Sequence, residues 1–544
     1  MSSPRPVEEA SKHPFTRVTV VLPWDLDPSL SAFPKKPGEG QLLVLETRAK
    51  VHALPWHRQK LTLVVSALRH FVQERRAAGF HVEHRVADDY AQGIAAFAKW
   101  AKPSSLHVMA PREWAIDARV RALTKKLPLT VHADGGPGGH FLVTRETFAA
   151  WADTQKGQLR MDRFYPEMRK ALGLLVDEKG KPEGGQWSFD ADNRGNARGV
   201  KMPPVPWFKP DALTKQVMRW VNVVGAWGTL DQNFGWPVTR AQALSWLEHF
   251  MKVRLKDFGP YEDAIRSDER FLFHSLLSVP LNLGLLRPHE VARAAAEKYR
   301  QGEVSLASAE GFIRQVIGWR EFIRGVYWRL MPGLRTANLL GATRPLPDFF
   351  WEPERTDLQC LREAISSVRD TGYAHHIFRL MVLCNYATLA GLDPRAVSHW
   401  FWAGFVDAYE WVELPNVVGM GMFGTDAFTT KPYVASAAYI KRQSGLSAKG
   451  RGPKAARDEA PCARCRYDPD QRSGPDACPY NALYWDFMAR HRERLSKNVR
   501  TRQLLSTLDR FGPAQVAAIR ATADAHLKTL APLTPGWTFD EDAG

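Results

Sequence analysis

The sequence predicts an α/β N-terminal domain with a doubly wound parallel sheet, followed by a large all-α C-terminal domain. Strand-like and helix-like segments alternate over residues 17–135, and nearly every periodic segment after Thr239 has helical spacing. The chain has 544 residues, 44% apolar and 24% charged. A chain of this length holds about two to four domains. We place the α/β domain at 16–145, a connection at 146–235 and the helical domain at 236–544.

The α/β domain is predicted from short apolar runs separated by helical segments. β-branched and apolar residues predict strands at Arg17–Leu22, Gln41–Leu45, Phe80–Val86, Leu106–Ala110 and Leu127–His132. Helical spacing predicts helices at His57–Ala78, Tyr90–Ala101 and Glu113–Lys126. Because strands and helices alternate, the sheet is expected to be parallel. No glycine fingerprint follows the first strand, so an ordinary dinucleotide site is not supported.

The rest of the chain divides into a connection and a helical part. A loop rich in Gly, Lys, Asp and Asn from Asp177 to Lys201 predicts a long connection. Periodic segments predict helices at Thr239–Leu255, Ser308–Met331, Asp357–Asp370, Tyr373–Ala390 and Pro479–His491. The segment Lys441–Ala460 carries six Lys and Arg among Gly and Ser, including Lys449, Arg451, Lys454 and Arg457. It is expected to be a basic surface loop that either contacts phosphates or is simply solvated.

Charge and composition restrict the partners. The net charge of +16 and the pI near 9.6 favour a polyanionic partner, most commonly nucleic acid, although such charge can also serve solubility. Apolar runs such as Leu380–Cys384 are too short to span a bilayer. The N-terminus lacks the apolar core of a secretory signal, so we expect a cytoplasmic protein with no membrane partner. The 19 Trp residues could pack, stack on planar rings or relay electrons.

Three of the five cysteines are clustered in a pattern typical of a metal centre. Cys462 and Cys465 form a C-x2-C pair, and Cys478 follows after twelve residues. Thiolates at this spacing bind zinc or an iron–sulfur cluster, and the alternative is a set of inert thiols. The proline after Cys478 is more typical of iron–sulfur sites, but spacing does not separate the two metals. The candidates for a fourth ligand are Cys360, Cys384 and His491.

Several polar strings interrupt the helical half. They are Phe258–Tyr261, His274–Ser278, Glu310–Arg324, Ala374–Met381 and Asp407–Gly419. Hydroxyls and N–H groups at a helix start, as in the second string, can cradle a pyrophosphate or simply cap the helix. Paired histidines on an otherwise apolar helix, as in the fourth, are costly unless they are used or satisfied.

Together these strings resemble the photolyase/cryptochrome family, and more narrowly its iron–sulfur bacterial cryptochromes and (6-4) photolyases. The resemblance extends from Gln59 to about Arg502. It implies a photolyase-like fold with an FAD-binding helical domain. In that branch four matching cysteines bind a 4Fe-4S cluster, and here they are Cys360, Cys462, Cys465 and Cys478. Cys384 then lies outside the ligand set.

The resemblance also implies which residues contact FAD. Arg379 and Asp407 match the family's pair near flavin N5, and the residue facing N5 is expected to be Glu413, with Asn416 as the alternative. The other implied contacts are Tyr261, His274, Ser275, Leu276, Leu277, Ser278, Gln315, Trp319 and Arg320.

The activity implied by the resemblance is light-driven repair of UV (6-4) photoproducts in DNA. Reduced flavin would pass an electron to a lesion flipped out of the duplex. His376 is the expected proton donor, with His375 and Gln315 beside it, because histidine changes charge near neutral pH. Trp400 and Trp351 would relay electrons to the flavin. The alternatives are a cryptochrome-type blue-light photoreceptor with little repair and a zinc-containing nucleic-acid-binding protein.

Two further ligands follow from the same resemblance. Relatives hold a ribityl-lumazine antenna near a Gly-Asp-Gln turn after the first strand, where this chain reads Leu22-Pro-Trp-Asp-Leu26. Pro23 removes an amide donor and Trp24 adds bulk, which leaves open an altered or absent antenna. Asp190, in the connection, could recruit Mg2+ against a DNA phosphate. We expect the protein to act as a monomer on UV-damaged DNA.

Overall fold

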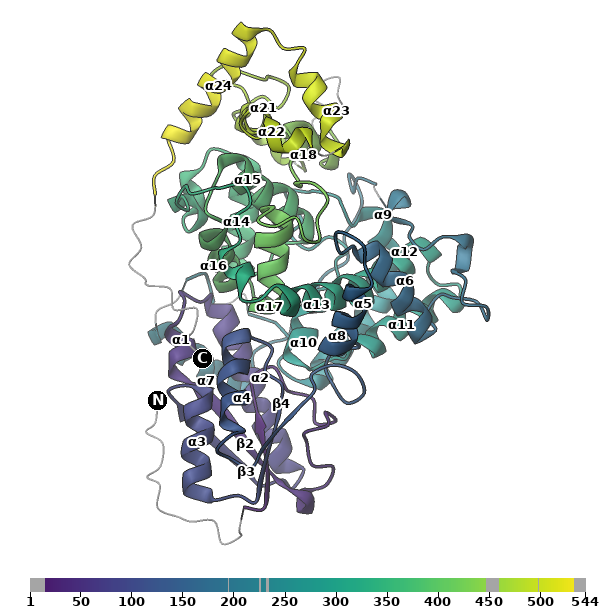
Figure 1. The fold of residues 1–544 in the computed structure, drawn as a ribbon, viewed down its shortest axis with the longest axis vertical. Helices are drawn as coiled ribbons and strands as arrows, with labels where there is room; N and C mark the ends of the chain where they lie inside the picture. The colour runs from purple at the N-terminus through teal and green to yellow at the C-terminus, as the bar shows by residue number, and fades with distance from the viewer. Residues whose placement is uncertain are drawn as a thin grey trace.

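Five parallel strands form the sheet that the alternating pattern predicts (Figure 1). The computed structural model describes residues 15–193, 195–224, 227–230, 234–446, 459–497 and 499–532. The strand order is β3-β2-β1-β4-β5, so the order reverses between β1 and β4. Val18 on β1 lies opposite Gln41 on β2 and Leu106 on β4. The strands are β1 (Arg17–Val21), β2 (Gln41–Thr47), β3 (Val82–Ala87), β4 (Ser105–Met109) and β5 (Leu129–His132).

Helices cover both faces of this sheet, which confirms the doubly wound arrangement. The predicted helices are present, and a short helix after β2 was not predicted. Their bounds are α1 (Arg48–His52), α2 (Arg58–Ala77), α3 (Tyr90–Ala101), α4 (Trp114–Leu123) and α7 (Ala212–Val224). Since both faces are covered, Val20 and Leu43 are fully buried.

The connection between the sheet and the helical part contains α5 (Arg145–Asp153) and α6 (Met161–Leu172), and single 3-10 turns at Glu183–Gly185 and Asp190–Asp192. It then continues into α7, which packs on α2 of the sheet domain. The segment expected to connect two domains therefore runs back along the first one.

The remainder of the described chain is helical, as predicted, and all its named strands end by His132. The first helices are α8 (Arg240–His249), α9 (Leu255–Tyr261), α10 (Ser278–Leu283), α11 (Pro288–Arg300), α12 (Leu306–Ile313), α13 (Arg320–Leu330), α14 (Gln359–Thr371), α15 (Asn385–Ala390) and α16 (Pro394–Gly404). The last are α17 (Glu410–Glu413), α18 (Ala437–Gln443), α20 (Pro461–Arg464), α21 (Pro479–Arg490), α22 (Arg492–Ser496), α23 (Val499–Leu508) and α24 (Pro513–Lys528). No helix in the described ranges is long and apolar enough to cross a membrane.

Within the described ranges, four π-helical segments are inserted into these helices: η5 (Phe250–Arg254), η6 (Arg314–Trp319), η10 (Phe378–Cys384) and η11 (Leu414–Gly421). Such wide turns occur frequently at functional sites. Three of them carry residues that the sequence singled out, namely Gln315, Arg379 and Asn416. The π turns therefore mark one region of the helical half before any ligand is considered.

One predicted helix is shorter than expected. The helix predicted from Tyr373 starts at His376, so His375 precedes it instead of lying on it. The reason is local: Gly372 ends α14 in the left-handed conformation (φ +67°), and the chain needs Tyr373–His375 to turn into the next helix. In the predicted basic loop, Lys449, Arg451, Lys454 and Arg457 lie outside the described residues.

Two apolar clusters join the sheet to the helical half. One continues from β2 and α2 into the helices around Phe378 and Trp400. The other packs the opposite side of the sheet against Tyr327, Tyr409 and Trp411. The segment from α16 to α17 is therefore clamped between the two parts of the molecule, and Asp407 lies within it.

Candidate functional site

Arg379 and Asp407 form a bidentate ion pair at the centre of the helical half. Arg379 donates from Nη1 to Oδ1 of Asp407 at 3.1 Å and from Nη2 to Oδ2 at 3.0 Å. Ser278 also donates to Oδ2, at 2.7 Å, and Asn282 donates to the Asp407 carbonyl. Arg379 belongs to the π segment η10, and Ser278 starts α10. Three separate elements therefore meet at one carboxylate.

Glu413 lies in the same electrostatic environment. Burial raises its pKa to about 7, while Arg379 opposes this rise and Asp407 adds to it. Asn416 is one turn further on, where its amide donates to the Val412 carbonyl at 2.9 Å. Of the two candidates for the residue facing N5, Glu413 is the one that interacts with the ion pair.

The loop before α10 is held in an uncommon backbone conformation. Leu272 and Leu276 both have positive φ, +42° and +59°, on either side of His274. Such left-handed non-glycine residues persist only where surrounding contacts fix them. Ser275 accepts a hydrogen bond from the Leu277 N–H, and the ring of Tyr261 stacks on Phe273 at 5.4 Å. The predicted cofactor-binding string is thus one rigid bend leading into α10.

Arg320 lies in an aromatic enclosure between the helical half and the sheet domain. Its guanidinium is 4.3 Å from the ring centroid of Phe141 and 5.2 Å from that of Trp411, and it pairs with Glu321 at 3.2 Å. Burial lowers its pKa to about 10. Its Nε and Nη2 are buried without a hydrogen-bond partner. A cation with unused buried donors suits an anionic or polar ligand.

The other two residues of this helix are placed differently. Trp319 is half-buried and its ring meets Phe322 edge-on at 6.1 Å. Gln315 is exposed, although it lies on the same π segment. Gln315 is therefore open to a macromolecular partner, whereas Arg320 faces the interior.

Three histidines, His274, His375 and His376, lie together near Arg379. The rings of His274 and His375 stack at 5.0 Å, and His376 meets His274 edge-on at 5.2 Å. His376 is half-exposed, and its Nε2 lies 3.1 Å from Oδ1 of Asp263. Burial raises the pKa of Glu262 to about 7, against the lowering effect of His376. Sequence reasoning missed Glu262 and Asp263, although they directly follow the string that ends in Tyr261.

The four cysteines that the resemblance groups together line one small cavity. Cys360 begins α14 at its first turn, Cys462 lies on α20, Cys465 ends it, and Cys478 directly precedes α21. Burial raises the pKa of Cys360 well above its usual value, and the other three thiols add to this rise. In the described residues, no three of these sulfurs lie within 4.8 Å of one another. A single zinc holds its sulfurs about 3.8 Å apart, so the wider spacing favours a multi-iron cluster.

The two other fourth-ligand candidates lie elsewhere. The Cys384 sulfur packs against Gly421, where an added Cβ would lie 2.7 Å from it. His491 packs on the ring of Phe487 at 4.6 Å. Neither residue lines the cysteine cavity. Among the candidates from the described chain, only Cys360 lies with the clustered cysteines.

Trp400 and Trp351 are connected through a third tryptophan. Trp400 is fully buried and donates from Nε1 to the Phe350 carbonyl at 2.8 Å. The ring of Trp227 lies 6.2 Å from Trp400 and 5.3 Å from Trp351, and Trp227 is partly exposed. Sequence reasoning missed Trp227 because it lies in the connection, far from the other two along the chain.

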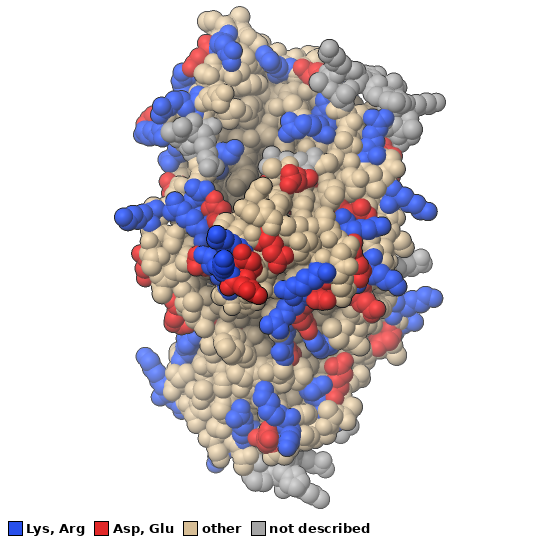
Figure 2. All heavy atoms as spheres, turned by 90° about the vertical axis from the view of Figure 1, so that its right-hand side faces the viewer, with Lys and Arg blue, Asp and Glu red and all other residues tan. Residues whose placement is uncertain are grey.

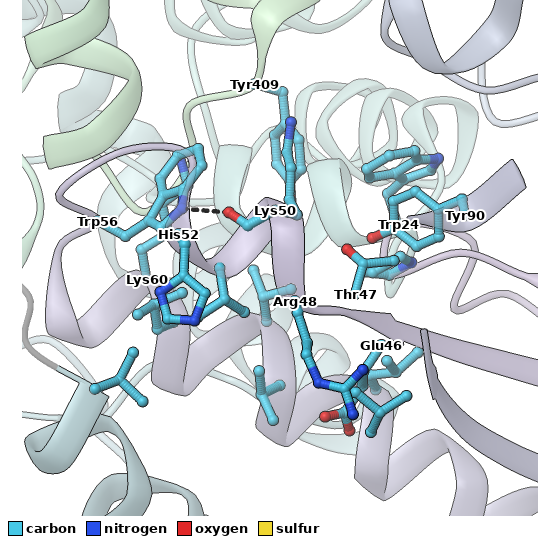
Figure 3. A pocket seen from close by; sticks show the side chains of 18 of the residues that line it. Trp24, Glu46, Thr47, Arg48, Lys50, His52, Trp56, Lys60, Tyr90 and Tyr409 are labelled. Atoms are coloured by element: carbon cyan, nitrogen blue, oxygen red, sulfur yellow. Dashed lines mark hydrogen bonds between the residues drawn. The ribbon is translucent and has the colours of Figure 1, made fainter. Parts of the chain in front are cut away.

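A second cavity lies at the carboxyl ends of the strands (Figure 3). Its volume is about 340 Å³, and it adjoins the ends of β1, β2 and β3. In open α/β sheets ligands bind at this edge, near the point where strand order reverses. Figure 3 shows aromatic and basic side chains around it. They include Trp24, Trp56, Tyr90, Trp402 and Tyr409, with Lys50, Lys60 and Glu113.

The unusual turn after β1 forms one wall of this cavity. The Trp24 ring packs edge-on against Tyr90 at 6.0 Å and Tyr409 at 6.2 Å. The bulk of Trp24 is therefore accommodated by packing, and the cavity remains. Lys60 donates to the Ala408 carbonyl at 2.7 Å, and burial lowers its pKa to about 7.

The connection contributes a charged group near the histidines. Asp190 pairs with Arg314 at 2.9 Å, and its side chain is 52% exposed. Figure 2 shows Lys and Arg spread over one face of the molecule, with Asp and Glu among them in the middle and a hollow in the upper half. Positive charge is thus distributed over this face and not collected in a single block.

Comparison with known proteins gives relatives of one kind. A family model described as "Deoxyribodipyrimidine photo-lyase-related protein" matches residues 19–236. The chain is 39% identical over 527 residues to a protein of Agrobacterium fabrum named "(6-4) photolyase", which covers 95% of this chain and 100% of that protein.

Solved structures with the same fold include a class III photolyase from Agrobacterium tumefaciens. It has a TM-score of 0.53 at 15% identity and covers 81% of this chain and 86% of its own. A cryptochrome of Synechocystis sp. PCC6803 has a TM-score of 0.56 at 14% identity, with 85% and 91% covered. These structures confirm the predicted fold class, and the near full-length match identifies the relatives. The chain therefore belongs to the photolyase/cryptochrome family.

Proposed function

We propose that this protein repairs (6-4) photoproducts in DNA under blue light. The observation that carries the proposal is the 39% identity, over 95% of the chain, to the (6-4) photolyase of Agrobacterium fabrum. The arrangement of His376, Asp263 and the Arg379–Asp407 pair supports it with the chemistry such a reaction needs.

The helical half suits FAD. Arg320 has two buried nitrogen atoms without partners, which a large polar ligand can satisfy. From the predicted set we assign the FAD contacts to Tyr261, His274, Ser275, Leu276, Leu277, Ser278, Trp319, Arg320, Arg379, Asp407 and Glu413. We leave out Gln315, which is exposed, and Asn416, whose amide donates to the Val412 carbonyl. When bound and reduced, FAD supplies the light-excited electron. Asp407 keeps the Arg379 guanidinium in place, and this cation would stabilise the negative charge of a reduced flavin bound beside it.

His376 holds the proton that the lesion needs. Asp263 fixes the orientation of the ring through a 3.1 Å contact at Nε2. The half-exposed position lets a flipped-out base reach the ring from solvent. His375, fully buried beside it, supports His376 by packing between His274 and Phe378.

Electrons reach the cofactor through tryptophans. Trp400 is the inner member and Trp351 the next, with partly exposed Trp227 in ring contact with both. This order follows from burial, because Trp400 is fully enclosed and Trp227 is the most exposed of the three.

A 4Fe-4S cluster joins the C-terminal helices. Cys360, Cys462, Cys465 and Cys478 come from α14, from α20 and its end, and from the start of α21, so one cluster would tie these elements together. The wide spacing of the sulfurs and the absence of His491 from their cavity support this assignment.

The cavity at the strand ends suits a planar antenna chromophore. Its volume of about 340 Å³ and its aromatic walls match a ring system, and Lys50 and Lys60 offer donors. A photolyase of Sulfolobus tokodaii has a TM-score of 0.52 at 13% identity, with 79% of this chain and 88% of its own covered. It is described with two FAD molecules, which are said to imply a novel light-harvesting cofactor. We place a lumazine-type antenna in this cavity.

The test uses an oligonucleotide carrying one (6-4) photoproduct, with reduced holoprotein, blue light and a dark control. Light-dependent recovery of undamaged thymines supports repair. If protein that holds FAD and iron gives no recovery, the proposal fails and a photoreceptor role is favoured. A parallel oligonucleotide with a cyclobutane dimer measures selectivity.

A further inference from the structure

Two of the three clustered histidines have buried ring nitrogens without a hydrogen-bond partner. His274 is 6% exposed and His375 is fully buried. Nε2 of His274 and both ring nitrogens of His375 have no hydrogen-bond partner. Buried polar atoms are rarely left unpartnered, so three such nitrogens in contacting rings call for an explanation.

The nitrogens converge. One ligand atom from each of His274, His375 and His376 lies within 4.8 Å of the other two, and among the described residues this is the one group of three His, Cys, Asp or Glu that meets this distance. Zinc–imidazole bonds of about 2.0–2.1 Å hold the nitrogens about 3.4 Å apart. Rotations that move each ring by about 1 Å would bring nitrogens that now lie within 4.8 Å of one another to the spacing of a zinc site, about 3.4 Å.

The third ring of the group has a carboxylate partner. The third ring, His376, contacts Asp263 at 3.1 Å. If Nδ1 of His376 binds the metal, Asp263 holds the other ring nitrogen, as carboxylates commonly do in zinc sites.

Charge and backbone also suit a cation here. Glu262 and Asp263 supply negative charge beside His376, against the positive charge of Arg254 and Arg379 near His274. His274 is fixed because its neighbours Leu272 and Leu276 have positive φ and Arg254 donates to the Leu272 carbonyl at 2.6 Å. The half-exposed ring of His376 gives an ion access from solvent.

We propose that His274, His375 and His376 bind a divalent transition-metal ion of the zinc class. Imidazole ligands suit zinc, copper and nickel, and a fourth position is open to water. A metal on His376 occupies the nitrogen that would carry the proton, so zinc blocks repair. This consequence rests on the proposed function, whereas the binding itself does not.

The binding test is a calorimetric titration of the holoprotein with Zn2+. The background is a double variant, His107→Asn with His132→Asn, because these two surface rings lie 3.0 Å apart and could bind zinc themselves. We expect one zinc per chain in this background, and at least a tenfold weaker affinity when His375→Asn is added. Unchanged affinity and stoichiometry in the triple variant would overturn the site.

A second measurement needs no variant of the cluster. Crystals of the holoprotein soaked with Zn2+ should give an anomalous peak between the three imidazoles, and a peak only elsewhere would overturn the proposal. In the repair assay, zinc should inhibit with the same half-saturation as binding, and a chelator should restore activity. Binding without inhibition would keep the metal site but refute His376 as proton donor.

Discussion

Asp407→Asn tests the centre of the candidate site. The carboxylate accepts two hydrogen bonds from Arg379, at 3.1 and 3.0 Å, and one from Ser278 at 2.7 Å. Asparagine keeps the shape but loses the charge, which leaves the guanidinium without its counter-ion. Removing one partner of a buried pair costs about 3–5 kcal/mol. The Arg379 side chain is 22% exposed, so we expect the lower end, about 3 kcal/mol.

This loss corresponds to a measurable change in melting temperature. A helical part of about 300 residues has an unfolding entropy near 0.6 kcal/mol per degree, so the midpoint should fall by about 5 °C. Calorimetry of the holoprotein measures this, with FAD content determined on the same sample. Glu493→Gln is the matched control, because it breaks a 3.1 Å pair with Lys497 that is 91% and 73% exposed. Such pairs contribute less than about 1 kcal/mol. Equal melting of the two variants would refute the buried-pair argument.

Three further predictions concern titration and metals. Burial raises the pKa of Glu413 from 4.5 to about 7, so between these two values the folded state binds more protons than the unfolded state and loses stability as pH rises. Glu413→Gln should therefore flatten the dependence of the melting temperature on pH between pH 5 and 8. An unchanged slope would contradict this prediction. Cys465→Ala should remove the visible absorbance and the iron of the cluster, and a stable variant with full iron content would show that the ligand set is wrong. Mg2+ should speed repair by competing with Arg314 for Asp190, so Asp190→Asn should abolish the response to Mg2+. A wild-type repair rate that does not change with Mg2+ would refute Asp190 as a Mg2+ ligand.

The fold was largely predictable because its signals are local. Parallel strands such as Arg17–Val21 are short apolar runs, and a helix such as α2 shows its buried stripe in the sequence. The start of the helix after Tyr373 was not predictable, since it depends on the turn that Gly372 allows. The π segments were not predicted either.

The residues of the site also differ in how far the sequence alone predicts them. Residues within distinctive strings, such as Arg379 and the cysteines, were found through the family resemblance. Trp227, Asp263 and the walls of the strand-end cavity were missed, because only the fold brings together segments so far apart in the chain. Composition indicated a nucleic-acid partner, but it does not indicate which surface binds it.

The most direct test of the repair mechanism separates electron transfer from proton transfer in His376→Asn. Wild type and variant, matched for FAD content, are mixed with (6-4) photoproduct DNA, and flavin fluorescence quenching is measured together with thymines restored per photon absorbed. The account predicts equal quenching in both proteins and loss of at least about 99% of the repair yield in the variant, since general acid catalysis contributes roughly a hundredfold or more. An undiminished yield would contradict the assignment of His376 as the proton donor.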